Sequence, residues 1–505
     1  MDKIGIISEA ITLPWLFSTK NIMRKKISCL LLLFLICFSS AYAVDYNVLN
    51  YGAKGDGATL DTKALQATID LCSKEGGGRV VLPRGIYLSG TINLKSGVEL
   101  HLDNGSEIRA TLDLGEYQQH NDSLSGLFYT EDAQNVAITG NGLINGRGME
   151  FMTDIPKTIF GLVLNDIRQG KNFRKVRDGG LGDGPVYPKP RFHQMIIFSN
   201  CKNVRLTDFH VKDAPYWTFL VVHCHDVWVE GLNIDNNLLI PNSDGLDIDY
   251  SSDVNVSDCI IRCGDDAITL TGYAHHFGDP GFKDIMEPSR NINISNCVLQ
   301  SRSAGIRIGG WDQNEMMDYN FSNISIYDSN RGILISLGDY AGLTNCNFNN
   351  INIHTRLHTG DWWGNGEPIR ISAMKGVAGH PVGKVRNVHF NNINCDGESS
   401  IVLWATDESL IENVSFTGFS FILKESKLED IEGGNFDLRP TLEPHKEIFK
   451  HDIPIVFIHN AKDIFFRDGT MKFEGERHSY HTRGLETEKV TGLHIENISC
   501  EGMEL

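Results

Sequence analysis

Proline and basic residues are scarce in this chain of 505 residues. It contains 15 prolines, and its 46 lysines and arginines are outnumbered by 64 acidic residues, which gives a formal net charge of −18. With 41% hydrophobic and 22% charged residues, the composition excludes a disordered, collagen-like or small disulfide-rich protein. The acidic balance argues against nucleic acid or an anionic membrane as the partner, although a local basic patch would still admit an acidic substrate.

The N-terminal segment lacks a hydrophobic run of bilayer length, because its apolar stretch at 27–38 is too short to span comfortably. Basic residues at 24–26 precede this stretch and Ala41-Tyr42-Ala43 follows it, an order typical of a secretory signal. We expect residues 1–43 to be that signal, with Met23 as an alternative start and cleavage after Ala43. Export to the periplasm or the medium follows, and the mature domain at 44–505 is not inserted into a membrane. A membrane anchor is the alternative interpretation.

Cysteine pairs with CxxC spacing are also absent, which argues against the common zinc-binding motifs. Of 11 cysteines, Cys29 and Cys37 lie in the expected signal, so nine remain in the mature chain. Two of these precede an Asn/Asp-Val pair by two residues, and two others follow the start of a similar pair by six. Such equivalent positions indicate stacked, buried thiols within a repeat rather than disulfides. We predict no metal site and no cofactor.

A short motif recurs along the chain: Asn or Asp, a branched apolar residue, any residue, and a second apolar residue. Its alternation has a period of two, so each copy indicates a strand with one buried face. Repeats of roughly 20–40 residues with several short strands each are typical of a solenoid. The pattern predicts an all-β fold, a right-handed parallel β-helix, whose Asn and Asp residues occupy tight turns. The nine copies begin at Asn135, Asn203, Asp226, Asp253, Asn291, Asn323, Asn387, Asn413 and Asp463.

Three segments interrupt this rhythm. Residues 61–73 read as an amphipathic helix that ends before three glycines at 76–78, and we expect this helix to cap the open N-terminal end of the solenoid. The segments 151–192 and 424–450 are rich in charged or turn residues. We interpret both as loops beside a binding groove, with solvated excursions as the alternative.

Three aspartates carry the most specific chemical signal. Asp244 precedes one expected strand, and Asp265 and Asp266 precede the strand one repeat later. Because stacked strands lie about 4.8 Å apart, these carboxylates should converge, and their mutual repulsion should let one of them retain a proton. A protonated and an ionised carboxyl together suit glycoside hydrolysis. Turn capping or calcium binding is the alternative.

The chain resembles glycoside hydrolase family 28, the polygalacturonase family. The resemblance rests on Asn-Ser-Asp-Gly at 242–245 and Gly-Asp-Asp at 264–266, supported by Tyr-Gly-Ala-Lys-Gly-Asp-Gly at 51–57 and Gly-Arg-Gly at 146–148. It implies an inverting hydrolase in which Asp265 donates a proton to the leaving oxygen, while Asp244 and Asp266 activate water. The acid and base of an inverting enzyme usually stand about 6.5–9.5 Å apart.

Two family motifs are missing. Where the family commonly has Gly-His-Gly the chain has Ser-Ala-Gly at 303–305, and where it has Arg-Ile-Lys the chain has Leu-Ile-Ser at 334–336. The expected parity of the strand turns Arg307 outward, so this residue is our candidate for binding an acidic sugar. A salt bridge to Asp247 or Asp249 is the alternative.

Other residues near the expected groove are candidates for sugar binding through aromatic stacking or hydrogen bonds. The paired tryptophans lie between glycines, which is unusual for core residues, but a tryptophan cluster covering the solenoid flank is the alternative. The candidate substrate-binding residues are Asn242, Asp247, His275, Arg307, Trp311, Trp362, Trp363 and Glu367.

The leading interpretation is therefore an exported glycoside hydrolase that acts on a pectin-type or related plant polysaccharide or oligosaccharide. A polysaccharide lyase with the same fold and a non-catalytic carbohydrate-binding solenoid are the alternatives. Retention of all three aspartates argues against the latter.

Overall fold

The computed structural model describes most of the chain from residue 44 onward. The described residues are 44–120, 122–154, 158–159, 162–163, 186–272, 280–283, 285, 287–310, 314–340, 342–358, 362–375, 379–428, 434–439 and 448–505. The expected signal at 1–43 and most of the interruption at 151–192 lie outside them. Within them, no helix is both long enough and apolar enough to cross a membrane.

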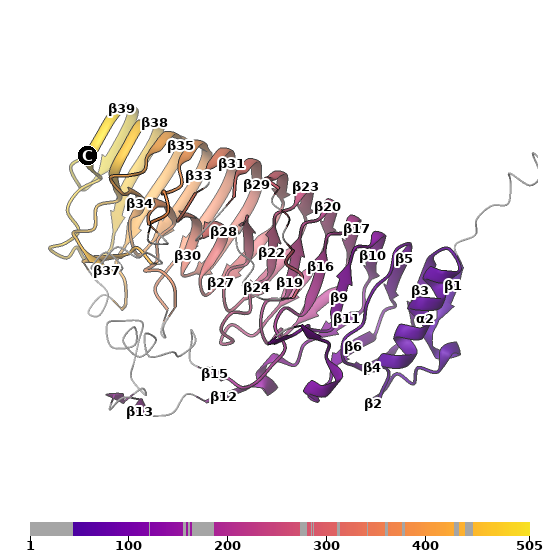
Figure 1. Ribbon diagram of the computed structural model, residues 1–505. Helices are drawn as coiled ribbons and strands as arrows, with labels where there is room; N and C mark the ends of the chain where they lie inside the picture. The colour runs from indigo at the N-terminus through magenta and orange to yellow at the C-terminus, as the bar shows by residue number, and fades with distance from the viewer. Residues whose placement is uncertain are drawn as a thin grey trace, which may run out of the picture. The chain divides into compact units, whose positions relative to one another are not determined.

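The unit Asp45–Leu505 is a right-handed parallel β-helix, as predicted (Figure 1). The chain runs through three stacks of strands, and each strand pairs in parallel with its equivalent one coil later. The first stack contains β1 Asp45–Asn47, β3 Gly78–Leu82, β5 Val98–Leu102, β10 Gln134–Gly140, β17 Lys202–Thr207, β20 His225–Glu230, β23 Ser252–Ser257, β26 Ser289–Ser295, β29 Met316–Ser329, β31 Leu343–Thr355, β33 Val385–Gly397, β35 Ile411–Lys424, β38 Val456–Glu474 and β39 Leu485–Glu501.

The second and third stacks have shorter strands. The second contains β2 Asp56–Leu60, β4 Gly85–Ser89, β6 Ser106–Ala110, β11 Leu143–Asn145, β18 His210–Lys212, β21 Asn233–Asp235, β24 Ile260–Cys263 and β27 Val298–Ser301. The third contains β9 Phe128–Glu131, β16 Ile196–Ser199, β19 Phe219–Val222, β22 Leu246–Asp249, β25 Ile268–Thr271, β28 Ala304–Gly310, β30 Arg331–Leu337, β32 Ile369–Ala373 and β34 Ile401–Ala405.

The remaining elements lie at the N-terminal end or in excursions from the coils. The helices are η1 Val48–Tyr51, α2 Thr62–Lys74, η2 Leu114–Glu116 and η3 Gly148–Phe151. Four antiparallel pairs join β7 Gln119–His120 to β8 Ser123–Leu124, β12 Met152–Asp154 to β15 Val186–Pro188, β13 Thr158–Ile159 to β14 Leu162–Val163, and β36 Asn435–Asp437 to β37 Ile448–Lys450.

The predicted capping helix is α2. Leu65, Ile69 and Cys72 form its buried side, and it packs against the first strands of the first stack (Figure 1). Its end is fixed by Gly77, whose N–H donates to the carbonyl of Cys72 at 2.9 Å and whose φ is +98°. A Cβ at this position would lie 2.5 Å from the carbonyl oxygen of Gly97, so glycine is required there on steric grounds as well.

The predicted turns are confirmed at all nine motif starts, where Asn or Asp has φ between 54° and 58°. These residue types tolerate the left-handed region better than other L-residues. Their side chains also bond between coils: Asn203 donates to Asn135 at 2.7 Å, and Asn413 donates to Asn387 at 2.9 Å. Each turn therefore satisfies local geometry and ties one coil to the next.

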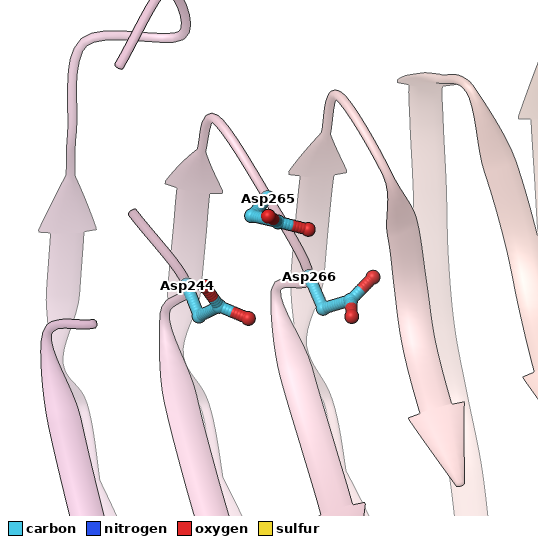
Figure 2. Close-up of side chains that lie close together, drawn as sticks. All are labelled: Asp244, Asp265 and Asp266. Atoms are coloured by element: carbon cyan, nitrogen blue, oxygen red, sulfur yellow. The ribbon is translucent and has the colours of Figure 1, made fainter. Parts of the chain in front are cut away.

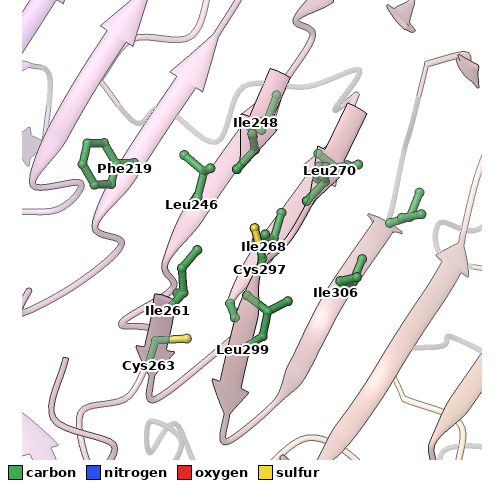
Figure 3. Close-up of a cluster of buried hydrophobic side chains, with 14 of the residues drawn as sticks. Phe219, Leu246, Ile248, Ile261, Cys263, Ile268, Leu270, Cys297, Leu299 and Ile306 are labelled. Carbon is green, nitrogen blue, oxygen red and sulfur yellow. The ribbon is translucent and has the colours of Figure 1, made fainter. Parts of the chain in front are cut away.

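The core fills the inside of the solenoid with equivalent side chains from successive coils (Figure 3). Five phenylalanines of the first stack lie face to face, with neighbouring centroids 4.5–5.1 Å apart. Among the described residues all nine cysteines are free, and eight of them are buried, as the prediction of stacked thiols requires. The five phenylalanines are Phe321, Phe348, Phe390, Phe416 and Phe466.

Candidate active site

The three aspartates lie in the turns that lead into β22 and β25. Leu246 pairs with Ile268, so the residue two positions before each strand, Asp244 or Asp266, occupies the same place in successive coils. The backbone fixes this register, since the N–H of Gly245 donates to the carbonyl of Asp266 at 2.9 Å. The predicted convergence is therefore a consequence of strand register.

One carboxylate oxygen from each of Asp244, Asp265 and Asp266 lies within 4.8 Å of the corresponding oxygens of the other two. Figure 2 shows the three side chains facing a common space from neighbouring turns. This distance joins single oxygen atoms, whereas the 6.5–9.5 Å of an inverting enzyme separates whole carboxyl groups. All three residues are at most 5% exposed, so they lie deeper than an open surface turn would place them.

The carboxyl groups differ in their hydrogen-bond partners. Both oxygens of Asp266 accept hydrogen bonds, Oδ1 from the N–H of Ala304 at 2.8 Å and Oδ2 from Arg307 at 3.2 Å. Asp265 accepts a long hydrogen bond of 3.4 Å from Asn242. The Oδ1 of Asp244 is buried and has no hydrogen-bond partner among the described residues.

Burial raises the pKa of Asp244 well above its usual range, and the negative charges of Asp247 and Asp266 raise it further. The pKa of Asp247 is also raised well above its usual range, mainly by burial and then by Asp266. Arg307 opposes both shifts. Burial and mutual repulsion therefore favour the protonated forms of Asp244 and Asp247.

An open pocket of about 610 Å³ contains the three carboxylates. Three of the candidate substrate-binding residues, Arg307, Asn242 and Trp363, are among its lining residues, and so is Leu334. The full lining is Tyr216, Trp217, Asn242, Asp244, Asp265, Asp266, Ser303, Arg307, Arg331, Leu334 and Trp363.

Sequence reasoning missed Tyr216, Trp217 and Arg331. Strand register would have identified two of them: Phe219 pairs with Leu246 and Ala304 pairs with Arg331. One column across the coils therefore holds Trp217, Asp244, Asp266, Ala304 and Arg331 in succession. Tyr216 and Trp217 stack with ring centroids 5.7 Å apart and give the pocket an aromatic wall, a surface suited to sugar rings.

Two predicted sugar-binding residues, Glu367 and Trp362, lie outside the catalytic pocket. Glu367 is 1% exposed and pairs with Arg331 at 3.3 Å, so its carboxylate is occupied in a buried ion pair. Trp362 is 2% exposed and does not line the catalytic pocket. Asp437, in the segment 434–439, accepts the N–H of Gly364 at 2.8 Å, which ties this segment to the turn that carries Trp362.

Trp363, in contrast to Trp362, lines the catalytic pocket. The guanidinium of Arg439 lies 5.0 Å from the centroid of its ring, and the same guanidinium donates to both oxygens of Asp437 at 2.9 Å. Part of the interruption at 424–450 is therefore packed against the wall of the pocket, as predicted for a groove-shaping loop.

The remaining candidates have different outcomes. Arg307 forms its ion pair with Asp266 at 3.2 Å, a partner that neither sequence interpretation had named. Asp247 is 3% exposed and does not line the pocket, so its predicted contact with sugar is not supported by its position. His275 and Trp311 lie outside the described residues.

The three carboxylates are close enough together to hold a metal ion. Carboxylate oxygens are the ligands that calcium and magnesium prefer, whereas Arg307 beside Asp266 favours a site without a further positive charge. Independence from metal therefore stays a prediction.

Residues 72–277 match the sequence profile of Glycosyl hydrolases family 28. The chain is 25% identical over 297 residues to an exo-poly-alpha-D-galacturonosidase of Dickeya chrysanthemi, covering 52% of this chain and 47% of the relative. It is 24% identical over 256 residues to a probable polygalacturonase of Vitis vinifera, covering 47% and 46%. The matched regions thus span about half the length of these relatives.

Among solved structures, a family 28 exopolygalacturonase of Yersinia enterocolitica matches with a TM-score of 0.61 and 18% identity, covering 92% of this chain and 79% of that one. At this identity the likeness is one of fold.

Proposed function

We propose that the chain hydrolyses glycosidic bonds in a pectin-type or related plant polysaccharide, because residues 72–277 match the model of Glycosyl hydrolases family 28. The observation that carries this proposal is the convergence of Asp244, Asp265 and Asp266 in one pocket. The relatives named for polygalacturonate cleavage support the substrate class. Arg307 adds a cation at the site where an acidic sugar would bind.

In the proposed mechanism Asp265 is the general acid. It accepts a long hydrogen bond of 3.4 Å from Asn242 and faces the space that it shares with Asp244 and Asp266 (Figure 2). Protonation of that oxygen allows the sugar to leave as an alcohol while positive charge develops at the anomeric carbon.

Asp244 and Asp266 hold the attacking water in this mechanism. Two hydrogen bonds restrain the oxygens of Asp266 and reduce its nucleophilicity, which suits it to accept a proton from water rather than to attack carbon. A protonated Asp244 can donate a hydrogen bond to the same water. Together these roles favour inversion at the anomeric carbon.

The short separation of the carboxylates makes the stereochemical outcome the critical test of this mechanism. Proton NMR recorded during the first turnovers should show a product of inverted anomeric configuration. A retained product would instead require a carboxylate nucleophile and a covalent intermediate.

Export of the mature protein remains part of the proposal. The order of basic, apolar and small residues at 24–43 supports it, and a polymeric plant substrate is accessible only outside the cytoplasm. Mass spectrometry of the protein recovered from culture medium or periplasm should find an N-terminus at Val44.

The function is tested with a panel of pectic and neutral polysaccharides, assayed for new reducing ends. A lyase would instead generate an unsaturated product with ultraviolet absorbance, and a carbohydrate-binding solenoid would bind without releasing ends. Activity that disappears in Asp265→Asn supports the hydrolase, whereas binding without cleavage by the wild type supports the binding solenoid.

A further inference from the structure

A second and larger pocket of about 920 Å³ lies next to the catalytic pocket. Neighbouring residues of the chain line the two pockets: Arg302 the second and Ser303 the first, Trp362 the second and Trp363 the first. The turn before β22 also contributes to both pockets, since Leu239 lines the second and Asn242 lines the first. The lining of the second pocket is Leu239, Arg302, Arg356, Leu357, His358, Trp362, Glu398, Lys427 and Leu428.

The described residues that line the second pocket include three cations, in a protein whose formal net charge is −18. Asp328 holds two of them side by side: its Oδ1 accepts from Nε of Arg356 at 2.5 Å and its Oδ2 from Nη1 of Arg302 at 3.5 Å. Lys427 is exposed at the rim. One carboxylate thus positions two guanidinium groups beside a cavity.

Both guanidinium groups have donors left over. Nη1 of Arg302 also bonds to the carbonyl of Asp328 and to His358, and Nη1 of Arg356 donates to the carbonyl of Leu357. Within the part of the chain that is described, neither Nη2 group has a hydrogen-bond partner. Two adjacent guanidinium groups with free N–H donors match the geometry of a carboxylate.

The other titratable groups of the pocket do not cancel this charge. Burial, together with the charges of Arg302 and Arg356, lowers the pKa of His358 to about 3, so it is neutral at ordinary pH. Glu398 accepts hydrogen bonds on one oxygen from Leu357 and Ser426, at 2.8 and 2.7 Å. Among the described residues, Arg302, Arg356 and Lys427 exceed Glu398 and Asp328 by one positive charge.

We propose that the second pocket binds the carboxylate of a uronic acid residue beyond the cleavage point of the polysaccharide. The inference rests on the proposed function and adds a substrate feature to it. The family's Arg-Ile-Lys position carries Leu334 and Ser336 on the sheet, whereas Arg302 and Arg356 are supplied by the turns beside it. The exposed Leu239 and the partly buried Leu428 offer apolar contacts for the ring of the same sugar.

The test compares Arg356→Gln with wild-type Arg356, both in the Asp265→Asn protein so that the ligand is not cleaved. Arg356 is 48% exposed, so its replacement should not unfold the chain. The matched control is Arg467→Gln, which removes an exposed arginine that pairs with Glu496 at 2.8 Å on the first stack. Calorimetry would measure binding of tetragalacturonate and of its methyl ester.

We expect Arg356→Gln to weaken tetragalacturonate binding about tenfold and to leave binding of the ester unchanged, while Arg467→Gln alters neither. Added salt should weaken only the Arg356-dependent part. Three results would overturn the inference. Arg356→Gln could leave tetragalacturonate binding unchanged, or it could weaken binding of the acid and of the ester equally. The third is that the Asp265→Asn protein does not bind tetragalacturonate. Failure of the proposed function has a separate signature, namely absence of hydrolysis by the wild type across the polysaccharide panel.

Discussion

Replacement of Asp265 by asparagine tests the central step of the proposed mechanism. The two side chains have the same shape, but the amide cannot donate a proton to a leaving oxygen. The turn should survive, because its restraints involve the backbone: the carbonyl of Asp265 accepts hydrogen bonds from Cys263 at 3.0 Å and from Ser301 at 2.5 Å. Loss of one negative charge among three crowded carboxylates should leave the melting temperature unchanged or slightly higher.

The magnitude of the loss follows from the role. General acid catalysis contributes about 10²–10⁴ in rate, or roughly 3–5 kcal/mol of activation free energy. Asp265→Asn should therefore lower kcat on the polysaccharide by at least about a hundredfold with little change in KM, since the long hydrogen bond to Asn242 can form with an amide too.

Two substrates separate this role from a purely structural one. The first is the polysaccharide, whose alcohol leaving group needs a proton. The second is a 4-nitrophenyl glycoside of the same sugar, whose leaving group departs as an anion. The variant should lose far less activity on the aryl glycoside. Equal losses on both substrates, or an unchanged rate on the polysaccharide, would refute the assignment of Asp265 as the acid.

Three further outcomes are expected. Arg307→Gln should lower kcat/KM on all substrates, because Arg307 contacts Asp266 at 3.2 Å. On acidic substrates kcat/KM should fall by about a further tenfold. An equal decrease on acidic and neutral substrates would show that Arg307 acts through its ion pair with Asp266 and does not bind the sugar carboxylate. Burial raises the pKa of Asp247 above 3.8, so the folded protein retains a proton that the unfolded chain has released, and this carboxyl destabilises the fold increasingly as pH rises above about 4. Asp247→Asn should therefore raise the melting temperature by roughly 1–3 °C at pH 7 and by nothing near pH 3, as scanning calorimetry at both pH values would show. Activity should persist in chelator; its loss, restored by calcium, would favour a metal ion held by the three carboxylates or the lyase alternative.

The repeat pattern was sufficient to predict the fold. Period-two alternation in nine short motifs requires strands with one buried face, and the Asn or Asp at each start predicts a left-handed turn, as found at φ of 54–58°. The helix at 62–74 was predicted to within one residue at each end, because amphipathic spacing and the following glycines are local signals.

The three aspartates were predictable for the same reason. Stacking in a solenoid places equivalent residues of successive coils side by side, so sequence position alone brings Asp244 next to Asp266. Trp217 and Arg331 belong to the same column and could have been found by aligning the strands of the third stack.

The rest of the site was decided by contacts between distant segments, for which no local pattern exists. Trp362 and Trp363 are adjacent and chemically identical, yet the first is buried outside the catalytic pocket, whereas the second lines that pocket beside Arg439. Glu367 was predicted to bind sugar but pairs with Arg331, because burial makes an unpaired charge too costly. The sequence by itself therefore determined the coils and the carboxylates that stacking aligns. Only the tertiary structure decided which charged and aromatic side chains remain accessible to a substrate, because the packing of segments some 70 residues apart determines their burial.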